Sequence, residues 1–422
     1  MITAPAHQIS QEAQGFAITV LFLAIVLASV IVAARPAQAQ MFEVLYSFQG
    51  SPDASGPTGP FVRDAAGNFF STSAGGGTFG QGTAFKLSGP GKETVLYSFC
   101  LQLYCHEGGN PTAGLAGDTQ GNLYGTASGG SFDTGFVFQL SPTGGEVVLY
   151  NFTGAADGAF PDGRLLRDAE GNLYGNAAGG GAYRNCGLDN AEGCGVVFKV
   201  TTTGTGAVLY NFTGGADGAQ PVGALVRDQK GNFYGATLTG GKYGYGTVFR
   251  LDGGGNETVL HSFRLNQTGH SDGANPNGDL IRDSKGNLYG TTSSGGNLNS
   301  DGVVFKLSKT GKETVLYRFQ GGLDGIIPLG GLVRDLKGNL YGTTVYGGGY
   351  ENCYNYGCGT VFKVDTAGRE IALHRFTGGA DGGNPPGGLF RDAQGNLYGT
   401  TAYGGFSTNC QNGCGIVFKL TP

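Results

Sequence analysis

Residues 331–344 read GLVRDLKGNLYGTT, and close variants of this stretch occur seven times in the chain. Each copy contains an Asp-x-x-Gly-Asn turn, whose first residues are Asp64, Asp118, Asp168, Asp228, Asp283, Asp335 and Asp392. Successive turn aspartates lie 50 to 60 residues apart, a period that indicates a solenoid, a propeller or an array. The stretch is therefore interpreted as part of a structural repeat.

The sixth repeat shows four strand-like runs. They cover residues 331–334, 339–344, 360–364 and 370–376, are rich in Val, Thr, Tyr and Phe, and are bounded by turn residues. Between the first two runs, Asp335 can hydrogen-bond the turn amides, and Gly338 can supply the positive φ that ends such a hairpin turn. The repeated aspartate is therefore expected to have a structural role. Four-stranded antiparallel sheets that repeat radially are the blades of a β-propeller.

The order of strands along the chain favours a closed ring. A fourth-strand sequence at residues 44–48 precedes the first hairpin, and the chain ends with a third-strand sequence at residues 416–420. Pairing these two runs would complete the last blade and cover an exposed strand edge, whereas an open array would need capping repeats. We predict an all-β, seven-bladed propeller of four-stranded antiparallel blades, formed by residues 40–422 as one domain and closed by the N-terminal strand. An open array is the alternative.

Several other side chains repeat with the blades. Every third strand carries a Phe and every fourth strand ends in one, which predicts an aromatic core between blades. The glycine inside the second strand is expected to mark a close backbone approach. An Arg precedes the turn aspartate in six repeats, with Gly117 in its place in the second, and packing or ion pairing is its expected role. His261 and His374 replace a repeated fourth-strand Tyr and are interpreted as structural.

The N-terminal segment resembles an export signal. Residues 16–34 are apolar, and Ala37-Gln38-Ala39 follows as a small-x-small cleavage signal, so residues 1–39 are predicted to be a secretory signal peptide. The alternative is an uncleaved membrane anchor, because no Lys or Arg precedes the run and its length approaches the ~20 residues of a membrane span. In either case the chain from residue 40 onward is expected outside the cytoplasm.

All eight cysteines occur in closely spaced pairs, which predicts disulfides in an exported chain. The pairs are Cys100/Cys105, Cys186/Cys194, Cys353/Cys358 and Cys410/Cys414. No metal site is predicted, because a structural zinc needs four ligands and each pair stands apart from further ligands. The expected location is secreted, periplasmic or at the cell surface.

The net charge of −5 with 14% charged residues gives no basic footprint for nucleic acid. It also argues against electrostatic attachment to anionic membranes. Membrane association is expected only if the N-terminal segment stays uncleaved, and a monomer is expected.

The repeats GLVRDLKGNLYGTT…GCGTVFKV and GGLFRDAQGNLYGTT…GCGIVFKL resemble the GloVer tandem repeat of the choice-of-anchor exported bacterial proteins. The resemblance covers essentially all of residues 41–422, and the first repeat departs most, with Asn68-Phe69-Phe70-Ser71 in place of Asn-Leu-Tyr-Gly. The family name implies repeats followed by varied C-terminal anchors. No such anchor is expected here, since Pro422 comes two residues after the last predicted strand. The resemblance implies no activity.

Function is expected on the face formed by the second-to-third and fourth-to-first loops, because these loops vary while the scaffold repeats. The candidate ligand-binding residues are loop tyrosines outside the repeat positions, Tyr183, Tyr243, Tyr245, Tyr346, Tyr350, Tyr354, Tyr356 and Tyr403. The weaker catalytic candidates are His106, Glu107 and His270, since His suits acid–base chemistry. Repeated Asp-Gly pairs in the fourth-to-first loops are explained by turns. No cofactor is predicted, although Ca²⁺ is kept as an alternative even though one Asp per loop falls short of its ~6–8 oxygen ligands.

These observations predict an exported, non-enzymatic binding or scaffold module that takes a glycan or protein through the long-loop face. One alternative is a lyase or hydrolase with its site on that face, by analogy with other propellers. The other alternative is a structural protein of the cell envelope.

Overall fold

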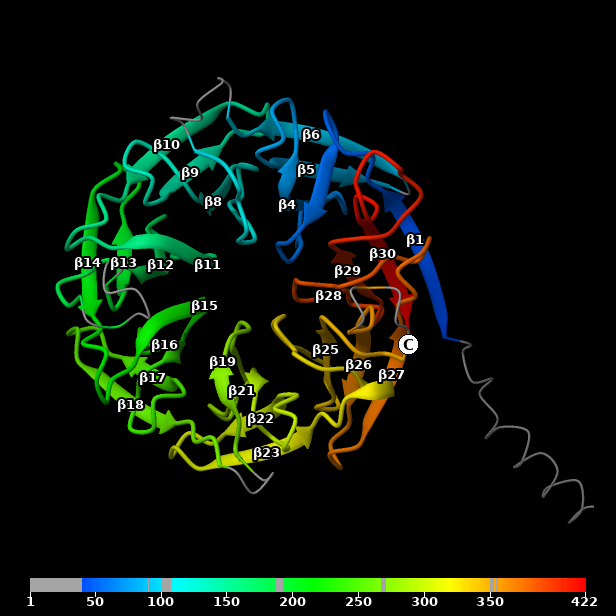
Figure 1. Cartoon of the computed structure of the whole chain (residues 1–422). Coiled ribbons are helices and arrows are strands. Elements are labelled where there is room, and N and C mark those ends of the chain that lie inside the picture. Colours follow the sequence, from blue (N-terminus) through cyan, green and yellow to red (C-terminus); the bar gives the residue numbers. More distant parts are fainter. Residues whose placement is uncertain are drawn as a thin grey trace, which may run out of the picture. The chain divides into compact units, whose positions relative to one another are not determined.

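The computed structural model describes residues 40–422, apart from residues 90, 101–107, 185, 187–192, 267–270, 350–352, 354 and 355. Residues 42–421 form one compact unit, in which seven antiparallel sheets surround a central axis (Figure 1). The predicted leader lies outside the described residues. Within the described part of the chain, no helix is both long and apolar enough to cross a membrane.

Blades 1 to 3 take the chain as far as Asn211. Blade 1 holds β2 (Ala54–Pro57), β3 (Val62–Arg63), β4 (Phe69–Gly76), β5 (Thr83–Ser88) and β6 (Lys92–Ser98). Blade 2 holds β7 (Ala116–Gly117), β8 (Leu123–Ala127), β9 (Phe136–Leu140) and β10 (Glu146–Asn151). Blade 3 holds β11 (Ala159–Arg167), β12 (Leu173–Gly179), β13 (Val196–Val200) and β14 (Gly206–Asn211).

Blades 4 to 7 complete the ring. Blade 4 holds β15 (Ala219–Arg227), β16 (Phe233–Thr239), β17 (Thr247–Leu251) and β18 (Glu257–Ser262). Blade 5 holds β19 (Ala274–Pro276), β20 (Ile281–Arg282), β21 (Leu288–Ser294), β22 (Val303–Leu307) and β23 (Glu313–Arg318), followed by the short 3₁₀ helix η1 (Gly322–Asp324). Blade 6 holds β24 (Val333–Arg334), β25 (Leu340–Thr344), β26 (Thr360–Val364) and β27 (Glu370–Arg375). Blade 7 holds β28 (Phe390–Arg391), β29 (Leu397–Thr401), β30 (Ile416–Thr421) and β1 (Met41–Ser47).

The predicted ring closure is confirmed. The sheet of blade 7 has the order β1-β30-β29-β28, so the N-terminal strand supplies the outer strand that the C-terminal repeat lacks. Figure 1 shows β1 in blue beside β30 in red. The fold is therefore a seven-bladed β-propeller of four-stranded antiparallel blades.

The innermost strands are less regular than predicted. The run predicted at residues 331–334 contributes only Val333 and Arg334 to β24, whereas β11 and β15 each span nine residues. In blades 1 and 5 the inner strand is split in two, and both parts pair with the second strand. The inner strands of blades 6 and 7 follow Pro-Leu-Gly-Gly and Pro-Pro-Gly-Gly, in which proline cannot donate to a ladder and glycine weakens one.

The predicted aromatic core between blades is confirmed. At each boundary, the Phe that follows an outer strand meets the third-strand Phe of the next blade, edge to face. The pairs are Phe48–Phe85, Phe99–Phe138, Phe152–Phe198, Phe212–Phe249, Phe263–Phe305, Phe319–Phe362 and Phe376–Phe418, with ring centroids 4.9 to 5.4 Å apart. All of these rings are at most 2% exposed. This geometry adds to the stabilisation from burial alone.

The repeated hairpin turn is held by its aspartate, as predicted. Asp335 Oδ1 accepts the Asn339 backbone N–H at 2.8 Å, and Oδ2 accepts both the Asn339 side-chain amide at 2.7 Å and the Tyr341 hydroxyl at 3.1 Å. Burial opposes ionisation of Asp335, but these hydrogen bonds lower its pKa on balance. The recurring geometry of this turn from blade to blade gives the aspartate a structural role.

The glycine inside the second strand was predicted to allow a close approach of another backbone, but the structure shows side chains next to it. A Cβ on Gly342 would lie 2.6 Å from Cζ of Phe362 on the paired third strand and 2.9 Å from Leu332 Cδ2. The close approach is therefore by side chains of the core, with the Phe ring nearest, and not by another backbone.

Candidate functional site

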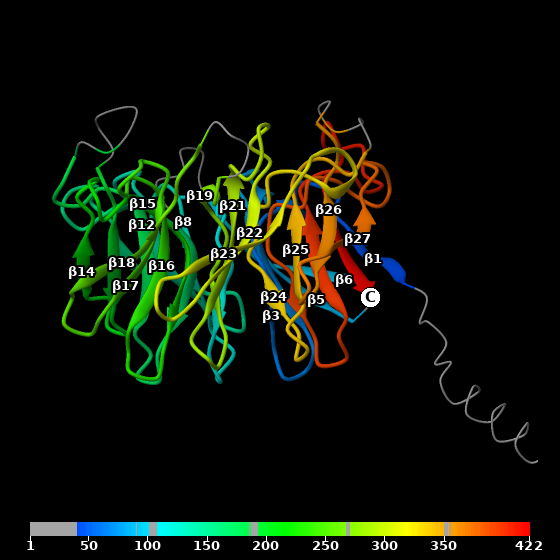
Figure 2. The same cartoon turned by 90° about the horizontal axis from the view of Figure 1, so that it is seen from below.

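The propeller has two unlike faces. The tight Asp-x-x-Gly turns lie at one end of the sheets, and the second-to-third and fourth-to-first loops lie at the other (Figure 2). The second group is the long-loop face, and its loops begin with glycines at positive φ, such as Gly240 and Gly241.

Among the residues that the structure describes, each second-to-third loop exposes one large apolar side chain. We call this set the apolar ring: Phe79, Phe132, Tyr183, Tyr243, Leu298, Tyr356 and Phe406, which are 40% to 79% exposed. Five of the seven follow a Gly-Gly-x pattern, Phe406 follows Gly-Gly directly, and Tyr356 lies later in its loop. Exposed large apolar side chains that recur near the start of the same loop in six blades indicate a contact surface.

The loops that carry the apolar ring are tied to the outer strands. In five blades the last residue of the outer strand accepts a backbone N–H at the start of the loop. The bonds are Thr78 N–H to Ser98, Ser131 to Asn151, Ala182 to Asn211, Lys242 to Ser262 and Phe406 to Ser47, at 2.8 to 3.4 Å. In these five blades, the backbone at or next to the exposed side chain is therefore fixed to the outer strand.

The eight predicted tyrosines separate into three groups. Tyr183, Tyr243 and Tyr356 belong to the apolar ring. Tyr245, Tyr346 and Tyr403 are partly buried, and Tyr346 packs against Tyr356 with ring centroids 5.8 Å apart. Tyr350 and Tyr354 lie outside the described residues. The sequence analysis missed Phe79, Phe132, Leu298 and Phe406, although the shared Gly-Gly pattern was present to reveal them.

The weak catalytic candidates His106, Glu107 and His270 also lie outside the described residues. The aspartates of the repeated Asp-Gly pairs form hydrogen bonds with side chains of the scaffold. Tyr317 donates its hydroxyl to Asp324 at 2.6 Å, and His374 Nε2 lies 3.1 Å from Asp381 in the equivalent place. The structure thus gives these aspartates a loop-fixing role and gives His374 the position of the repeated Tyr.

Three of the predicted cysteine pairs form disulfides, Cys186–Cys194, Cys353–Cys358 and Cys410–Cys414. Cys100 is also disulfide-bonded, and its predicted partner Cys105 lies outside the described residues. Each of the three closes a second-to-third loop just before its third strand. Disulfides persist in oxidising compartments, which indicates a location outside the cytoplasm.

The central channel is lined by the start of each inner strand. Six blades place glycine five residues before the turn aspartate, namely Gly59, Gly163, Gly223, Gly278, Gly330 and Gly387, and all of these except Gly59 line the channel cavity. A Cβ on Gly330 would lie 2.5 Å from the Gly387 carbonyl oxygen of the next blade. Glycine is needed here because the blades converge on the axis.

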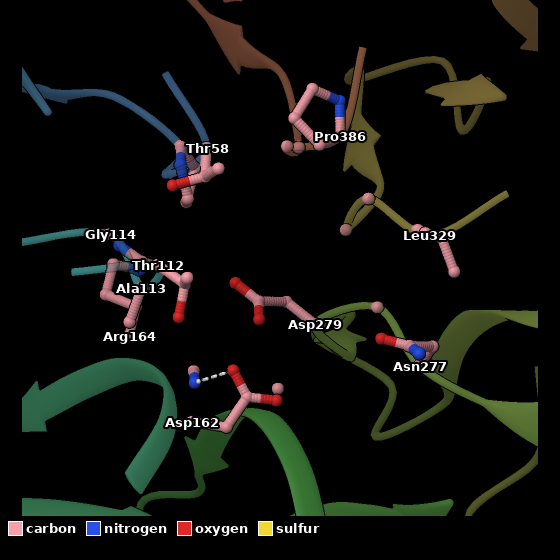
Figure 3. A pocket seen from close by; sticks show the side chains of 18 residues that line it. Thr58, Thr112, Ala113, Gly114, Asp162, Arg164, Asn277, Asp279, Leu329 and Pro386 are labelled. Atoms are coloured by element: carbon pink, nitrogen blue, oxygen red, sulfur yellow. Dashed lines mark hydrogen bonds between the residues drawn. The ribbon is translucent and has the colours of Figure 1, made fainter. Parts of the chain in front are cut away.

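Two carboxylates break the repeat inside this channel. Figure 3 shows Asp162 and Asp279 pointing into the same space from blades 3 and 5. Burial and the nearby Asp279 charge raise the pKa of Asp162, although the Gly163 N–H donates to Asp162 at 2.8 Å and opposes that rise. The cavity of about 100 Å³ is smaller than the ~300–1,000 Å³ of organic-ligand sites. The sequence analysis missed this pair. Its signal was a charge at positions that are uncharged in most repeats, although Arg164 of the third repeat stands at the place of Asp279 and lines the same cavity.

A second group of carboxyls lies between blades at the outer strands. Burial, and then the Asp217 charge from the blade before, raise the pKa of Glu257 to about 7. Burial likewise raises the pKa of Glu370 to about 7, with Asp324 adding to the rise and Arg375 opposing it. These glutamates recur at the same place in the repeat, so they belong to the scaffold.

The class of protein defined by this fold is the seven-bladed β-propeller with an elaborated loop face. The Gloeobacter/Verrucomicrobia repeat family matches residues 28–188 and 187–356 in tandem, so the chain belongs to that family. This confirms the resemblance drawn from the repeats. No curated protein matches the chain.

The chain is similar to several solved structures at low sequence identity. The extracellular domain of a protein described as a one-component system from B. thetaiotaomicron is 11% identical, with a TM-score of 0.50, over 89% of this chain and 39% of that one. A protein of unknown function from Bacteroides thetaiotaomicron is 14% identical, with a TM-score of 0.45, over 91% and 76% of the two chains. A protein described as an oxidoreductase (glucose dehydrogenase) from Thermus thermophilus is 14% identical, with a TM-score of 0.42, over 91% and 100%. The first likeness supports the fold alone.

Proposed function

We propose that this chain is an exported, non-enzymatic binding and scaffold module whose long-loop face binds a protein partner. Its proposed location is secreted, periplasmic or at the cell surface. The observation that carries the proposal is the apolar ring, because aromatic side chains are enriched in protein interfaces and six of the seven members of the ring are aromatic. The strand-anchored loops support it further, since a surface that is ordered before binding loses less entropy on association.

The distribution of the apolar ring favours a protein over a glycan. Seven side chains on seven loops suit a broad surface, and a typical partner covers ~800 Å². Two cations also lie close to the Tyr243 ring, with Lys242 Nζ 5.2 Å and Arg264 Cζ 5.5 Å from its centroid. Mixed apolar and cationic contacts of this kind occur at protein interfaces, in which Tyr and Arg are frequent anchors.

The test replaces three members of the apolar ring, Phe132→Ser, Tyr243→Ser and Phe406→Ser, in one variant. Envelope proteins and glycans of the producing cells are presented to the immobilised chain, the bound partner is identified by mass spectrometry, and its Kd is then measured. We expect at least tenfold weaker binding by the triple variant. The matched control is Leu336→Ser, because Leu336 is fully exposed on the opposite face, and its Kd should match the wild type.

Equal affinity of the triple variant and the wild type would reject the apolar ring as the binding surface. Binding that survives protease treatment of the partner fraction but is lost after periodate oxidation would replace the protein partner with a glycan.

A further inference from the structure

One blade boundary lacks a side chain that the other six possess. On the tight-turn face, the Arg before the turn aspartate reaches the second-strand ring of the preceding blade. Arg334 Cζ lies 5.6 Å from the Tyr289 ring centroid, and Arg167, Arg227 and Arg282 lie 5.4 to 5.6 Å from Tyr124, Tyr174 and Tyr234. Arg391 and Arg63 lie close enough to Tyr341 and Tyr398 to act on their charge. The repeat thus stacks a guanidinium on the ring of the preceding blade at four boundaries and places one nearby at the other two.

Between blades 1 and 2 the guanidinium and the tyrosine hydroxyl are both absent. Gly117 takes the place of the Arg, and Phe70 takes the place of the Tyr. Asp283 Oδ2 accepts the Tyr289 hydroxyl at 3.0 Å. Its counterpart Asp64 accepts only its own turn partner, Asn68, among the described side chains.

The missing side chains leave a larger pocket. The boundary between blades 1 and 2 encloses about 370 Å³, and the equivalent space beside Arg334, between blades 5 and 6, encloses about 260 Å³. Val62, Phe70, Leu96 and Leu123 supply apolar lining. The charged residues of the lining are Asp64, Asp118, Lys86 and Lys92. This volume falls in the ~300–1,000 Å³ range of small-molecule sites.

The boundaries that contain the arginine indicate which chemical group the pocket between blades 1 and 2 could bind. A neighbouring lysine does not exclude a guanidinium, because Lys306 Nζ lies 5.8 Å from the same Tyr289 ring that Arg334 covers. Lys86 Nζ occupies the corresponding place at 5.8 Å from the Phe70 ring. A planar cation with an aliphatic stem would therefore meet the same surroundings at Phe70 as Arg334 meets at Tyr289.

We propose that the pocket between blades 1 and 2 binds a guanidinium group of the arginine side-chain type. The cation stacks on Phe70 and faces the Asp64 carboxylate, while its methylene stem packs on Leu96 and Leu123. The group comes from a free small molecule or from an arginine of a polypeptide. This site lies on the opposite face from the apolar ring and is independent of the function proposed above.

The probe is N-acetyl-arginine amide, whose charge is confined to the guanidinium, and binding is followed by saturation-transfer NMR. We expect the wild type to bind it at one site. Gly117→Arg should weaken binding at least tenfold by filling the pocket from within. This change suits the backbone, since a Cβ on Gly117 finds its nearest atom, Val62 Cγ1, at 3.6 Å.

The matched control is Arg334→Gly, which should create a second pocket at Tyr289 and raise the number of bound probes from one to two. Phe70→Leu keeps the apolar volume but removes the ring, and should weaken binding severalfold even if Gly117→Arg folds poorly. N-acetyl-glutamate and N-acetyl-lysine amide serve as comparison probes. A heptapeptide with a central arginine that binds at least tenfold tighter assigns the source to a polypeptide, and equal affinity assigns it to a small molecule.

The proposal is overturned if the wild type does not bind the arginine probe. It is also overturned if Gly117→Arg binds the probe unchanged, or if the glutamate or lysine probe binds as well as the arginine probe.

Discussion

The boundary between blades 1 and 2 and the boundary between blades 5 and 6 are built from the same repeat but end differently at the tight-turn face. Both share the buried Phe pair, Phe99–Phe138 in one and Phe319–Phe362 in the other, at 5.2 and 5.1 Å. At the turn edge, the boundary between blades 5 and 6 has Arg334 over Tyr289, whereas Gly117 and Phe70 line one pocket at the boundary between blades 1 and 2. The contrast indicates that the aromatic core holds adjacent blades together, and that a boundary can form without the Arg–Tyr contact at its turn edge.

The largest expected effect concerns the buried Phe pair, which both boundaries share. Phe99→Ala and Phe319→Ala each remove a fully buried ring, and each should lower the free energy of unfolding by about 3–5 kcal/mol. The two losses should agree within about 1 kcal/mol, because both rings are at most 1% exposed in the same edge-to-face contact. Urea unfolding followed by far-UV circular dichroism measures both. A much smaller loss for Phe99→Ala would show that the open boundary is weak throughout.

A smaller effect concerns the tyrosine hydroxyl, which Tyr289 provides at the boundary between blades 5 and 6 and which Phe70 lacks at the boundary between blades 1 and 2. Tyr289→Phe removes the 3.0 Å hydrogen bond to Asp283 and should lower the free energy of unfolding by about 1 kcal/mol. Phe70→Tyr should raise it by a similar or smaller amount, since Asp64 has an acceptor at the matching place. The same urea titration measures both changes. If the two substitutions shift stability in the same direction, the hydroxyl is not what separates these boundaries.

The smallest effect is a pH dependence at the outer edge of the boundary between blades 5 and 6. The pKa of Glu370 is raised to about 7 by burial and by Asp324, so its neutral form is favoured by folding. Its contribution to stability is complete below about pH 4.5 and is lost as the pH rises through about 7. The Tm should therefore fall between pH 5.5 and pH 8.5.

Glu370→Gln should reduce the decrease in Tm with pH but not abolish it. Glu93, Glu257 and Glu313 also have raised pKa values, and they still contribute in this variant. Lys337→Gln, on the exposed turn of blade 6, provides the control and should leave the slope unchanged. A Glu370→Gln variant with the wild-type slope would show that this glutamate is ionised in the folded chain at neutral pH.

The repeating part of the sequence allowed the architecture to be predicted closely. A residue type that recurs at one position in every blade indicates that the local structure at that position also recurs. For this reason the turn of Asp335, the Phe core and the closing strand at residues 44–48 could be predicted. The inner strands were predicted less well. Their length depends on how the blades meet at the axis, and glycine and proline there shorten the ladder by an amount that composition alone does not specify.

The candidate sites depend on contacts between repeats, which spacing along the chain does not reveal. Gly117 and Phe70 each stood out as departures from the pattern, but only the structure shows that they line one pocket at a blade boundary. Asp162 and Asp279 come from blades 3 and 5 and meet only at the axis. The apolar ring was found in part, because tyrosines were sought by residue type when position after the Gly-Gly pair was the common feature.

Closure of blade 7 by β1 has a consequence for the kinetics of the molecule. β1 (Met41–Ser47) and β30 (Ile416–Thr421) are separated by nearly the whole propeller, and joining ends so distant costs about 5 kcal/mol of chain entropy at ~(3/2)RT ln n. Contacts of such high sequence separation form slowly. This seam is therefore expected to be the last part of the ring to assemble and the first to open. Its local reinforcement is consistent with that role, since the Asn409 side chain donates to the Gln49 carbonyl at 2.9 Å beside the Cys410–Cys414 disulfide.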